Sequence, residues 1–284
     1  TNIDREHLDY YRDVEEIKEA FLQFANIVPF YGSTILCVDD PHVREILPHI
    51  KRRVITYGLA PDAEYRAEGI SPAGASTGFS LIHRDVLLGS VKLNVPGLFN
   101  VRNALAAAAV AREMEMAFPA IRRGLAAFTG VQRRLEVRGE CTAITVVDDY
   151  GHHPTEIRAT LAAARQVWSG RIICIFQPHR YTRTQALFEE FLTAFGDADC
   201  LLVTDIYPAS EEPIAGVTAK ALCEAIQRAG HPDAHHFSDP DAIVEYLAKI
   251  ARPSDVVLTQ GAGSVWRVGE TFLNRIRRET ADAR

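Results

Sequence analysis

The stretch Val147-Asp148-Asp149-Tyr150-Gly151-His152-His153-Pro154-Thr155-Glu156 decides how the second half of the chain folds. The apolar run Ile144 to Val147 ends in two aspartates, and a helical pattern begins soon afterwards. The apolar run Ile172 to Phe176 is followed in the same way by Gln177-Pro178-His179-Arg180-Tyr181-Thr182-Arg183-Thr184. We therefore expect both stretches to be loops that leave the carboxyl ends of strands, where open α/β sheets bind ligands.

Strands and helices alternate regularly around these loops. The expected strands are 142–148, 171–177, 200–206, 234–237 and 255–260, and the expected helices are 154–168, 183–195, 218–229, 240–250 and 264–279. Alternation at this spacing predicts a parallel sheet with right-handed crossovers. Residues 137–284 are thus predicted to form a Rossmann-like, mostly parallel α/β domain.

The first half has a different pattern. The expected helices are 14–27, 41–47, 99–114 and 120–128, with short buried strands at 35–38 and 53–57. Alternating segments between residues 63 and 95, separated by Gly, Pro and Ser, suggest antiparallel strands. The segment from Thr129 to Gly139, rich in Gly and Arg, is the expected linker, so residues 1–136 are predicted to form a separate α/β domain.

Composition restricts the class of protein. The chain has 284 residues, 47% of them hydrophobic, and a net charge of -6. This charge argues against a nucleic-acid or acidic-membrane partner, because either would call for a basic surface. The five cysteines lack a CxxC pair, and no apolar run approaches the ~20 residues that span a bilayer. We therefore expect a cytoplasmic protein with reduced thiols; nothing in the sequence indicates its oligomeric state.

The two loops carry the residue types expected of a ligand site. Asp148-Asp149 lies where doubly wound domains place a carboxylate on a ribose hydroxyl, although an aspartate could also cap the next helix. His179, Arg180 and Arg183 form a cationic tip, and the planar fork of arginine matches a carboxylate or a phosphate. A surface charge run is the alternative. His152-His153 has no third ligand at metal spacing, so a zinc site is disfavoured.

Other candidate sites are weaker. Gly261-Ala262-Gly263-Ser264 could hold a phosphate at a helix start, but a tight structural turn is favoured because a further glycine in register is missing. Asn100 and Asn103 lie at the start of an Ala-rich helix, where one would cap the helix and the other could contact adenine. Arg133-Arg134 could be surface charge or a phosphate clamp. His7, beside carboxylates, could be an ordinary surface histidine or a ligand of a divalent ion.

Several motifs taken together resemble the Mur ligases. They are Thr-Asn-Ile-x-x-x-His-Leu-Asp at residues 1–9, Pro29-Phe30-Tyr31-Gly32, Asn100-Val101-Arg102-Asn103-Ala104, Arg133-Arg134, and the two loop stretches quoted above. Within that family, the members that join L-alanine to UDP-N-acetylmuramate match best. A relative that attaches a recycled tripeptide to the same sugar nucleotide is the alternative, and it differs in the loop 177–184.

The resemblance implies a fold and an activity. Mur ligases have a UDP-sugar domain, a central ATPase domain with a P-loop and a Rossmann-like carboxyl-terminal domain. This chain matches the last part of the central domain and the carboxyl-terminal domain. It lacks a G-x-x-x-x-G-K-S/T stretch and an initiator methionine, so we expect a fragment that is inactive alone. The implied reaction forms an acyl phosphate from ATP and the muramate carboxylate, which the L-alanine amine then attacks, with ATP and Mg²⁺ as cofactors.

The resemblance also implies roles for individual residues. The set implied for ATP and its metal is Asn100 and Asn103 at adenine, Arg134 at phosphate, Asp149 at the ribose and His7 at Mg²⁺. The set implied for L-alanine and the muramoyl carboxylate is Tyr150, His152, His179, Arg180 and Arg183. The attacking amine must be neutral, and His152 is a candidate base.

Two other classes of protein are kept as alternatives. In a non-catalytic nucleotide-binding module, the same loops would bind a ligand without chemistry. A nicotinamide-dependent dehydrogenase would need a dinucleotide fingerprint, which the glycine stretch 261–264 does not complete. The dehydrogenase is therefore disfavoured.

Overall fold

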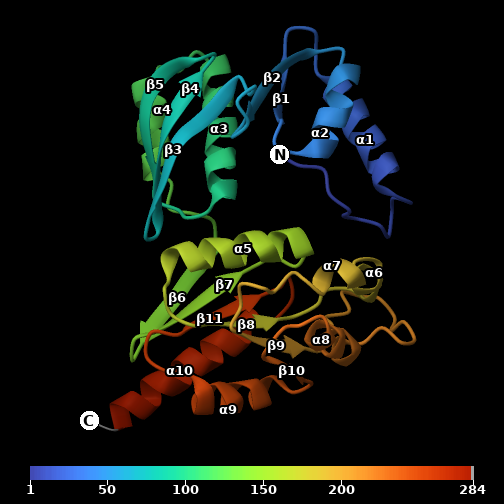
Figure 1. Ribbon diagram of the computed structural model, residues 1–284, viewed down its shortest axis with the longest axis vertical. Coiled ribbons are helices and arrows are strands. Elements are labelled where there is room, and N and C mark those ends of the chain that lie inside the picture. Colours follow the sequence, from blue (N-terminus) through green and yellow to red (C-terminus); the bar gives the residue numbers. More distant parts are fainter. Residues whose placement is uncertain (283–284) are drawn as a thin grey trace. The chain divides into compact units, whose positions relative to one another are not determined.

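The computed structural model describes residues 1–282 and divides into two compact units at Thr129 and Gly130 (Figure 1). This division lies before the expected boundary at residue 136, and the last residues of the expected linker, 136–139, belong to a strand of the second unit. Strand β6 (Glu136–Cys141) pairs antiparallel with β7 (Ile144–Asp149). It was missed because its polar residues, typical of an edge strand, show no sustained apolar face.

The second unit is built on a six-stranded sheet in the order β10-β9-β8-β11-β7-β6. The remaining strands are β8 (Ile172–Phe176), β9 (Cys200–Thr204), β10 (Ala234–Phe237) and β11 (Val256–Gln260). All neighbouring pairs are parallel except β6 with β7. The prediction of a Rossmann-like, mostly parallel sheet is therefore confirmed. The last strand, β11, lies between β7 and β8 and separates the two quoted loops by one strand.

Apolar side chains on both faces of the sheet hold the second unit together. The five residues of β8 are all buried, as are those of β9 and β11. Ile173 and Ile175 belong to a core shared with α9 (Pro240–Ile250) and α10 (Trp266–Asp282), including the fully buried Phe272. Helix α5 (Pro154–Val167) covers the opposite face (Figure 1). Each such buried side chain contributes roughly 1.5–3 kcal/mol.

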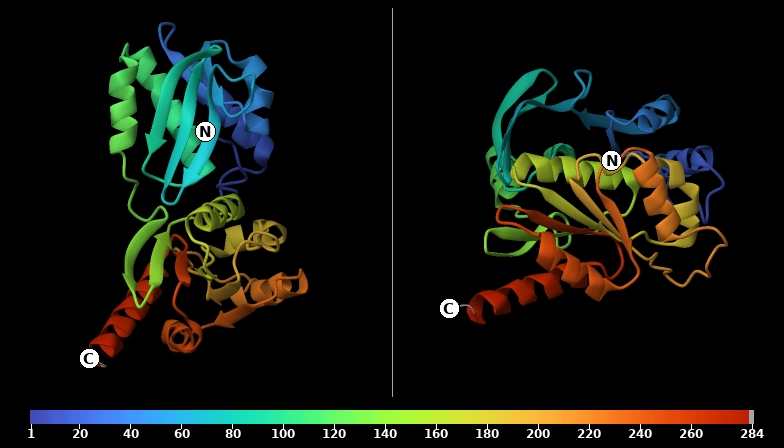
Figure 2. Two further views of the ribbon diagram at one scale, coloured as in Figure 1. Left: turned by 60° about the vertical axis from the view of Figure 1, so that its left-hand side comes forward. Right: turned by 60° about the horizontal axis from the view of Figure 1, so that its bottom comes forward.

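The first unit has a five-stranded sheet of mixed direction in the order β1-β2-β3-β4-β5. Its strands are β1 (Ser33–Cys37), β2 (Arg53–Gly58), β3 (Tyr65–Ala73), β4 (Ser76–His83) and β5 (Val86–Leu93). The first three are parallel, and the long strands β3, β4 and β5 form the expected antiparallel part, side by side in Figure 2. The helices are α1 (Val14–Ile27), α2 (Pro41–Ile46), the 3-10 turn η1 (Leu47–His49), α3 (Leu98–Glu113) and α4 (Phe118–Ala127).

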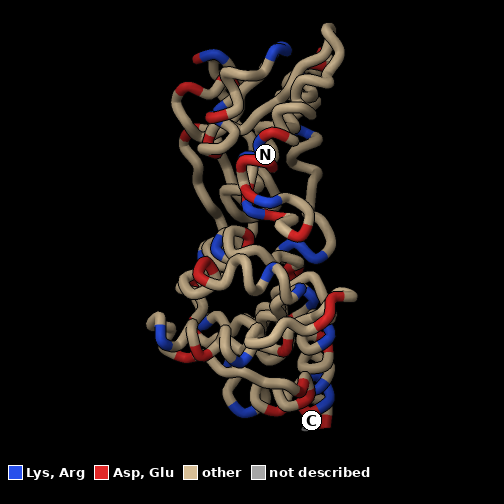
Figure 3. Tube along the Cα trace, turned by 90° about the vertical axis from the view of Figure 1, so that its right-hand side faces the viewer, with Lys and Arg blue, Asp and Glu red and all other residues tan. Residues whose placement is uncertain are grey.

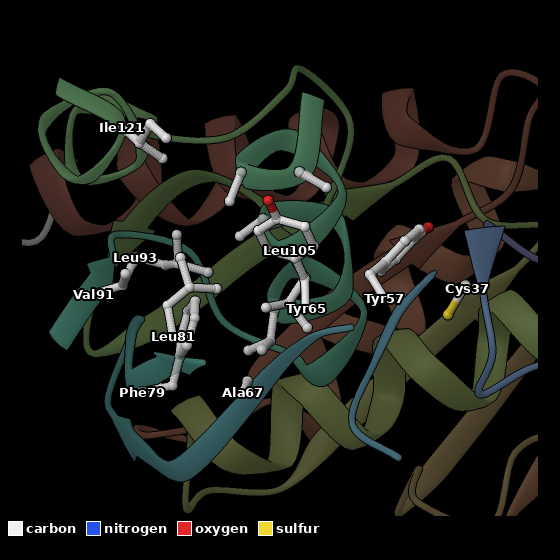
Figure 4. Packing of buried hydrophobic residues seen from close by; sticks show 14 of the residues in the cluster. Cys37, Tyr57, Tyr65, Ala67, Phe79, Leu81, Val91, Leu93, Leu105 and Ile121 are labelled. Carbon is white, nitrogen blue, oxygen red and sulfur yellow. The ribbon is translucent and has the colours of Figure 1, made fainter. Parts of the chain in front are cut away.

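Small residues of α3 allow the helix to approach the sheet closely. Leu105, Ala108 and Ala109 are completely buried, and Leu105 lies among side chains such as Leu81 from the sheet (Figure 4). The alanine run is therefore both a helix-forming sequence and a packing surface. This unit has its own core, as the sequence predicts.

One helix of the second unit differs from the expectation. The sequence predicts one helix over 183–195, whereas the structure has two short ones, α6 (Tyr181–Ala186) and α7 (Phe188–Phe191), and then α8 (Ala219–Arg228) after β9. Leu187, with φ -111°, leaves helical geometry between the first two and is buried. An apolar side chain that packs inward thus interrupts the helix, so the single-helix prediction is wrong.

The surface charges are mixed (Figure 3) and the thiols are unpaired, as the composition predicts. Lys and Arg are interspersed with Asp and Glu along both units (Figure 3). The cysteines are free thiols, four of them buried. Among the described residues 1–282, no helix combines the length and the apolar character needed to cross a membrane.

Candidate active site

Asp149, the last residue of β7, supports the turn that follows the strand. Its Oδ1 accepts hydrogen bonds from Gly151 N at 2.7 Å and Thr160 Oγ1 at 3.1 Å, and its Oδ2 accepts one from Leu135 N at 2.9 Å. Only 2% of Asp149 is exposed, and burial raises its pKa although these backbone donors oppose the shift. In this conformation Asp149 holds the turn. Its expected contact with a ribose stays a prediction.

Asp148 forms a second buried anchor on the same strand. Its Oδ2 accepts a hydrogen bond from Arg133 Nε at 2.7 Å, and its Oδ1 accepts one from Thr259 Oγ1 at 2.7 Å. Arg133 also donates through Nη2 to the carbonyl oxygen of Gly261 at 2.8 Å. Arg133 therefore ties the segment before β6 to the ends of β7 and β11.

The helix after the turn begins with a capping box formed by His153 and Glu156. Thr155 N donates to His153 Nδ1 at 3.3 Å, while Glu156 Oε2 accepts from His153 N at 3.2 Å and from His152 N at 3.0 Å. Pro154 occupies the first helical turn, as its fixed φ favours. The cap of α5 is thus His153 rather than an aspartate, and Glu156 fixes the backbone that presents His152.

Tyr150 projects from the turn beside two arginines. The guanidinium carbons of Arg133 and Arg134 lie 5.0 Å and 5.6 Å from the centre of its ring, within the range of cation-π attraction. The Arg134 side chain is 48% exposed, and its Nη1 lies 3.5 Å from Glu156 Oε1. Of the two arginines, Arg134 is the more exposed, and Arg133 is held by Asp148 and the Gly261 carbonyl; the expected phosphate contact of Arg134 stays a prediction.

On the second loop, the side chain of His179 contacts both the ring of Tyr207 and the guanidinium of Arg183. The His179 ring stacks on Tyr207 with centroids 5.5 Å apart and planes at 13°. Arg183 Nη1 donates to His179 Nδ1 at 3.0 Å and to its carbonyl oxygen at 3.1 Å. Burial lowers the pKa of His179 to about 4, and the nearby His152, Arg183 and Arg180 act in the same direction. His179 is therefore neutral at pH 7, with its proton on Nε2, because a guanidinium can only donate.

The two loops meet although β11 separates their strands. The rings of His152 and His179 lie 5.5 Å apart, and Tyr150 lies 5.7 Å from His152 on the same side. The predicted set Tyr150, His152, His179 and Arg183 is thus joined through direct neighbours. β11 ends at Gln260, level with Asp149 at the end of β7 and Phe176 at the end of β8, so the two loops begin at the same edge of the sheet.

The glycine stretch at the end of β11 is a structural turn, as expected. Gln177 Oε1 accepts hydrogen bonds from Ser264 N at 2.8 Å and from Val265 N at 3.2 Å, which are the amides a phosphate would need. A Cβ at Gly263 would lie 2.4 Å from the same Oε1 atom and 2.7 Å from the Tyr207 ring. Glycine is required here for close packing, and the favoured interpretation is confirmed.

In the first unit, the two candidate adenine contacts lie inside a helix rather than at its cap. The N-cap of α3 is Gly97, with φ 92°, so the expectation that an asparagine caps this helix is wrong. Asn100 Nδ2 donates to the carbonyl oxygen of Pro96 at 2.7 Å, which fixes the orientation of its amide. Asn103, one helical turn later, is exposed.

His7 lies on an exposed loop of the first unit with φ 54°. Within residues 1–282, no group of three or more His, Cys, Asp or Glu side chains is arranged to hold a metal ion. Mg²⁺ prefers oxygen ligands in octahedral geometry, which one imidazole does not supply. The described residues therefore do not fit a magnesium site by themselves, and the role of His7 stays a prediction.

Three residues of the site have no role predicted from the sequence: Glu156, which lies in the first quoted stretch, Tyr207 and Glu211. Glu156 had a local signal, because a carboxylate three residues after a cap residue is the capping-box pattern. Tyr207 and Glu211 lie on the loop between β9 and α8, far along the chain from the second loop. The fold brings them into direct contact with it. No local sequence pattern could have identified them.

Two family models match the chain. The Mur ligase middle domain matches residues 1–111, and the Mur ligase glutamate ligase domain matches residues 133–263. The two matches correspond to the two compact units of the structure.

Curated relatives carry the same name at high identity. The UDP-N-acetylmuramate–L-alanine ligase of Syntrophus aciditrophicus is 60% identical over 284 residues, and that of Geotalea uraniireducens is 50% identical over 277 residues. The alignments cover 100% and 98% of this chain but 59% and 60% of the relatives. The chain therefore spans about three fifths of the length of these relatives.

Solved structures share the fold. The UDP-N-acetylmuramate-alanine ligase of Thermotoga maritima matches with a TM-score of 0.76 at 26% identity, over 97% of this chain and 58% of that one. MurF ligase from Thermotoga maritima, solved in complex with ADP, matches with a TM-score of 0.74 at 20% identity, over 98% of this chain and 61% of that one. Because both family models and these folds agree, the chain belongs to the Mur ligases and carries their middle domain and their glutamate ligase domain.

Proposed function

We propose that this chain is the amino-acid-adding part of an ATP-dependent ligase that joins L-alanine to the carboxylate of UDP-N-acetylmuramate. The observation that carries the proposal is the meeting of the two loops, with His152 and His179 5.5 Å apart beside Arg180 and Arg183. Cationic forks next to a neutral ring suit a substrate that carries a carboxylate and an amine. The names of the curated relatives support the choice of L-alanine.

The proposed reaction has two steps. A muramate carboxylate oxygen attacks the γ-phosphorus of ATP, so ADP leaves and an acyl phosphate forms. The neutral amine of L-alanine then attacks the acyl carbon, inorganic phosphate leaves, and the amide keeps one N–H after a proton is lost. A free carboxylate is a poor acylating agent, and the mixed anhydride supplies the leaving group that it lacks.

The loop geometry supports different roles for the two arginines. Arg183 is bonded to His179 through Nη1, which fixes it beside the ring. Arg180 is the N-cap residue of helix α6, and its side chain is 36% exposed. We assign Arg180 to the carboxylate of L-alanine, with Arg183 holding His179 and adding positive charge. Tyr150 lines the same place from the first loop.

The two histidines are not equivalent as bases. His179 has a pKa of about 4 and uses Nδ1 to accept a bond from Arg183, so it is a poor base at neutral pH. His152 lies on the first loop, where Glu156 Oε2 is 3.8 Å from its Nδ1. Within this proposal, His152 takes the proton that the alanine ammonium must lose, while Nε2–H of His179 can donate a hydrogen bond to the substrate.

ATP would supply the phosphoryl group, and each unit, taken by itself, has side chains suited to bind part of a nucleotide. The amide of Asn100 is oriented by Pro96, so its Oδ1 can accept a bond from the exocyclic amine of adenine. Asn103 is exposed one turn further along, and Arg134 offers a guanidinium for phosphate. No step is assigned to a metal, because the described residues do not fit one by themselves.

The test uses the full-length ligase, meaning this chain together with the sequence by which its curated relatives exceed it. Arg180→Ala is expected to raise the KM for L-alanine by about 100-fold, because the substrate carboxylate loses its fork. The KM for ATP should stay within about twofold of the wild-type value. Alanine-dependent phosphate release is the measurement. Arg228→Ala, an exposed arginine on α8, is the matched control.

Each outcome of this test has a clear meaning. An unchanged KM for L-alanine in Arg180→Ala would refute the assignment of the second loop. Turnover of a tripeptide in preference to L-alanine by the wild-type enzyme would favour the recycling ligase instead. Absence of any phosphate release from a folded full-length protein would favour a non-catalytic module. The chain alone, without a P-loop stretch, is expected to release no phosphate from ATP.

A further inference from the structure

The second loop is supported by the loop between β9 and α8, which none of the family motifs includes. Arg180 N donates to the carbonyl oxygen of Tyr207 at 2.8 Å, and Tyr207 N donates to that of Pro178 at 2.8 Å. His179 and Tyr207 form a parallel bridge, and their rings stack. Backbone and side chain of one loop thus hold the other as an added strand would.

Glu211, on the same supporting loop, binds the start of helix α6. Thr182 N donates to Glu211 Oε2 at 3.0 Å, and Thr182 Oγ1 donates to Oε1 at 2.6 Å. The helix has Arg180 at its N-cap position, and among the described residues no side-chain bond from that cap residue closes the first turn. Glu211 therefore supplies the cap from a distant part of the chain.

The backbone that Glu211 holds is in a disfavoured conformation. Arg180 has φ 70°, in the left-handed region that side chains other than glycine rarely adopt. On the supporting loop, Ala209 and Ser210 also have positive φ values, 48° and 72°. They lie in a turn that is closed by a hydrogen bond from Glu211 N to the carbonyl oxygen of Pro208. Such conformations persist only where surrounding contacts impose them, and they cluster at functional sites. The contacts of Glu211 and Tyr207 are among those that hold Arg180 in this conformation.

Glu211 also faces the arginine side chain. Its Oε1 lies 3.7 Å from Arg180 Nη1, and its side chain is 16% exposed. Burial alone would raise the pKa of Glu211, but the hydrogen bonds from Thr182 and the charge of Arg180 lower it overall. The carboxylate is therefore charged at neutral pH. A guanidinium has five N–H donors, so this ion pair is compatible with a bidentate grip on a substrate carboxylate.

We propose that Glu211 is a positioning residue for the amino-acid substrate, which holds both the backbone and the guanidinium of Arg180 in the geometry that binds the substrate carboxylate. This inference rests on the proposed function, because it assigns Arg180 to that carboxylate. It adds a residue from a third loop, outside both motifs, to the determinants of amino-acid binding. Misplacing a binding group by about 1 Å can cost 100-fold, so the expected effect on the substrate is large.

The test compares three variants of the full-length ligase. Glu211→Gln keeps the size of the side chain and an oxygen that can accept from Thr182, but it removes the charge that faces Arg180. Its KM for L-alanine is expected to rise about tenfold, and that of Glu211→Ala by up to about 100-fold. The KM for ATP should stay within about twofold in both variants. Glu212→Ala, an exposed carboxylate next in the chain, is the control and should match the wild type.

A double variant shows whether Glu211 acts through Arg180. Arg180→Ala with Glu211→Ala should bind L-alanine no worse than Arg180→Ala alone, because the group to be positioned is gone. A wild-type KM for L-alanine in Glu211→Gln, or fully additive losses in the double variant, would overturn the inference and leave Glu211 as a helix cap. If Arg180→Ala itself leaves the KM unchanged, the proposed function fails instead, so the two failures are distinguishable.

Discussion

The two loops of the candidate site are stabilised in different ways. The loop after β7 is held by two carboxylates of its own stretch of chain. Asp149 accepts hydrogen bonds from Gly151 and from the flanking Leu135 and Thr160, and Glu156 accepts them from His152 and His153. The loop after β8 is held from outside, by Tyr207 and Glu211 of a third loop. The conformation of the loop after β7 therefore depends on its own carboxylates. The conformation of the loop after β8 depends on contacts with another loop, and we expect that these can be weakened without unfolding the sheet.

The largest expected effect on stability comes from Asp149→Ala. The substitution leaves Gly151 N, Leu135 N and Thr160 Oγ1 without their buried acceptor, at about 1–3 kcal/mol each. We expect the free energy of unfolding to fall by about 3 kcal/mol or more. Urea unfolding followed by tryptophan fluorescence measures it, because both tryptophans, Trp168 and Trp266, lie in the second unit.

The control for this prediction is Asp197→Ala, an exposed aspartate before β9. It should change the free energy of unfolding by less than about 0.5 kcal/mol. If Asp149→Ala proves as mild as this control, the loop after β7 is not held by its buried carboxylate. The contrast between the two loops would then disappear.

Gly151→Ala tests the same loop by crowding. An added Cβ would lie 2.6 Å from Asp149 Oδ1 and 3.2 Å from Glu156 Cβ, so the turn must shift. We expect a loss of about 1–3 kcal/mol in the same urea experiment. Gly196→Ala is the matched control, because nothing lies within 4 Å of its built Cβ. Equal free energies of unfolding for the two variants would show that the turn accommodates the added Cβ.

The last prediction concerns the second loop and appears as a dependence of stability on pH. The pKa of His179 is about 4 in the folded chain and ordinarily near 6.5 in an unfolded one. Between these two pH values the unfolded chain binds more protons than the folded chain. The contribution of neutral His179 to the free energy of unfolding is therefore fully present above about pH 6.5 and is lost as the pH falls toward 4. His179→Phe, which keeps a ring on Tyr207, should flatten the slope of unfolding free energy against pH in this window.

Urea unfolding at several pH values checks this last prediction. Identical slopes for the wild type and His179→Phe would mean that His179 titrates alike in both states. The ring would then be open to protonation rather than held neutral between Tyr207 and Arg183.

The difference between the loops also explains what the sequence could predict. The strands of the second unit were predictable because parallel strands buried on both faces are continuous apolar runs, such as Ile172 to Phe176. The loop after β7 was predictable because its motif lies in one stretch of chain. The support of the loop after β8 was not, because Glu211 lies 29 residues from Thr182 and only the fold joins them.

Some features of the fold were also beyond sequence patterns. Strand β6 is a polar edge strand, so neither strong alternation nor an apolar run marks it. The position of β11 between β7 and β8 depends on how the crossovers pack, and the order of elements along the chain does not determine it. The burial of Asp149 likewise depends on three donors from separate segments, although its place at a strand end was correctly anticipated.

The central claim is that the loops after β7 and β8 form a single binding site. Nitrogen-detected NMR of the histidine rings in the full-length ligase, titrated with L-alanine in the presence of a non-hydrolysable ATP analogue, tests it directly. We predict that the ring signals of His152 and His179 shift together and saturate at the same concentration, while that of His235 on β10 stays in place. Shifts confined to one of the two rings, or to neither, would contradict the account.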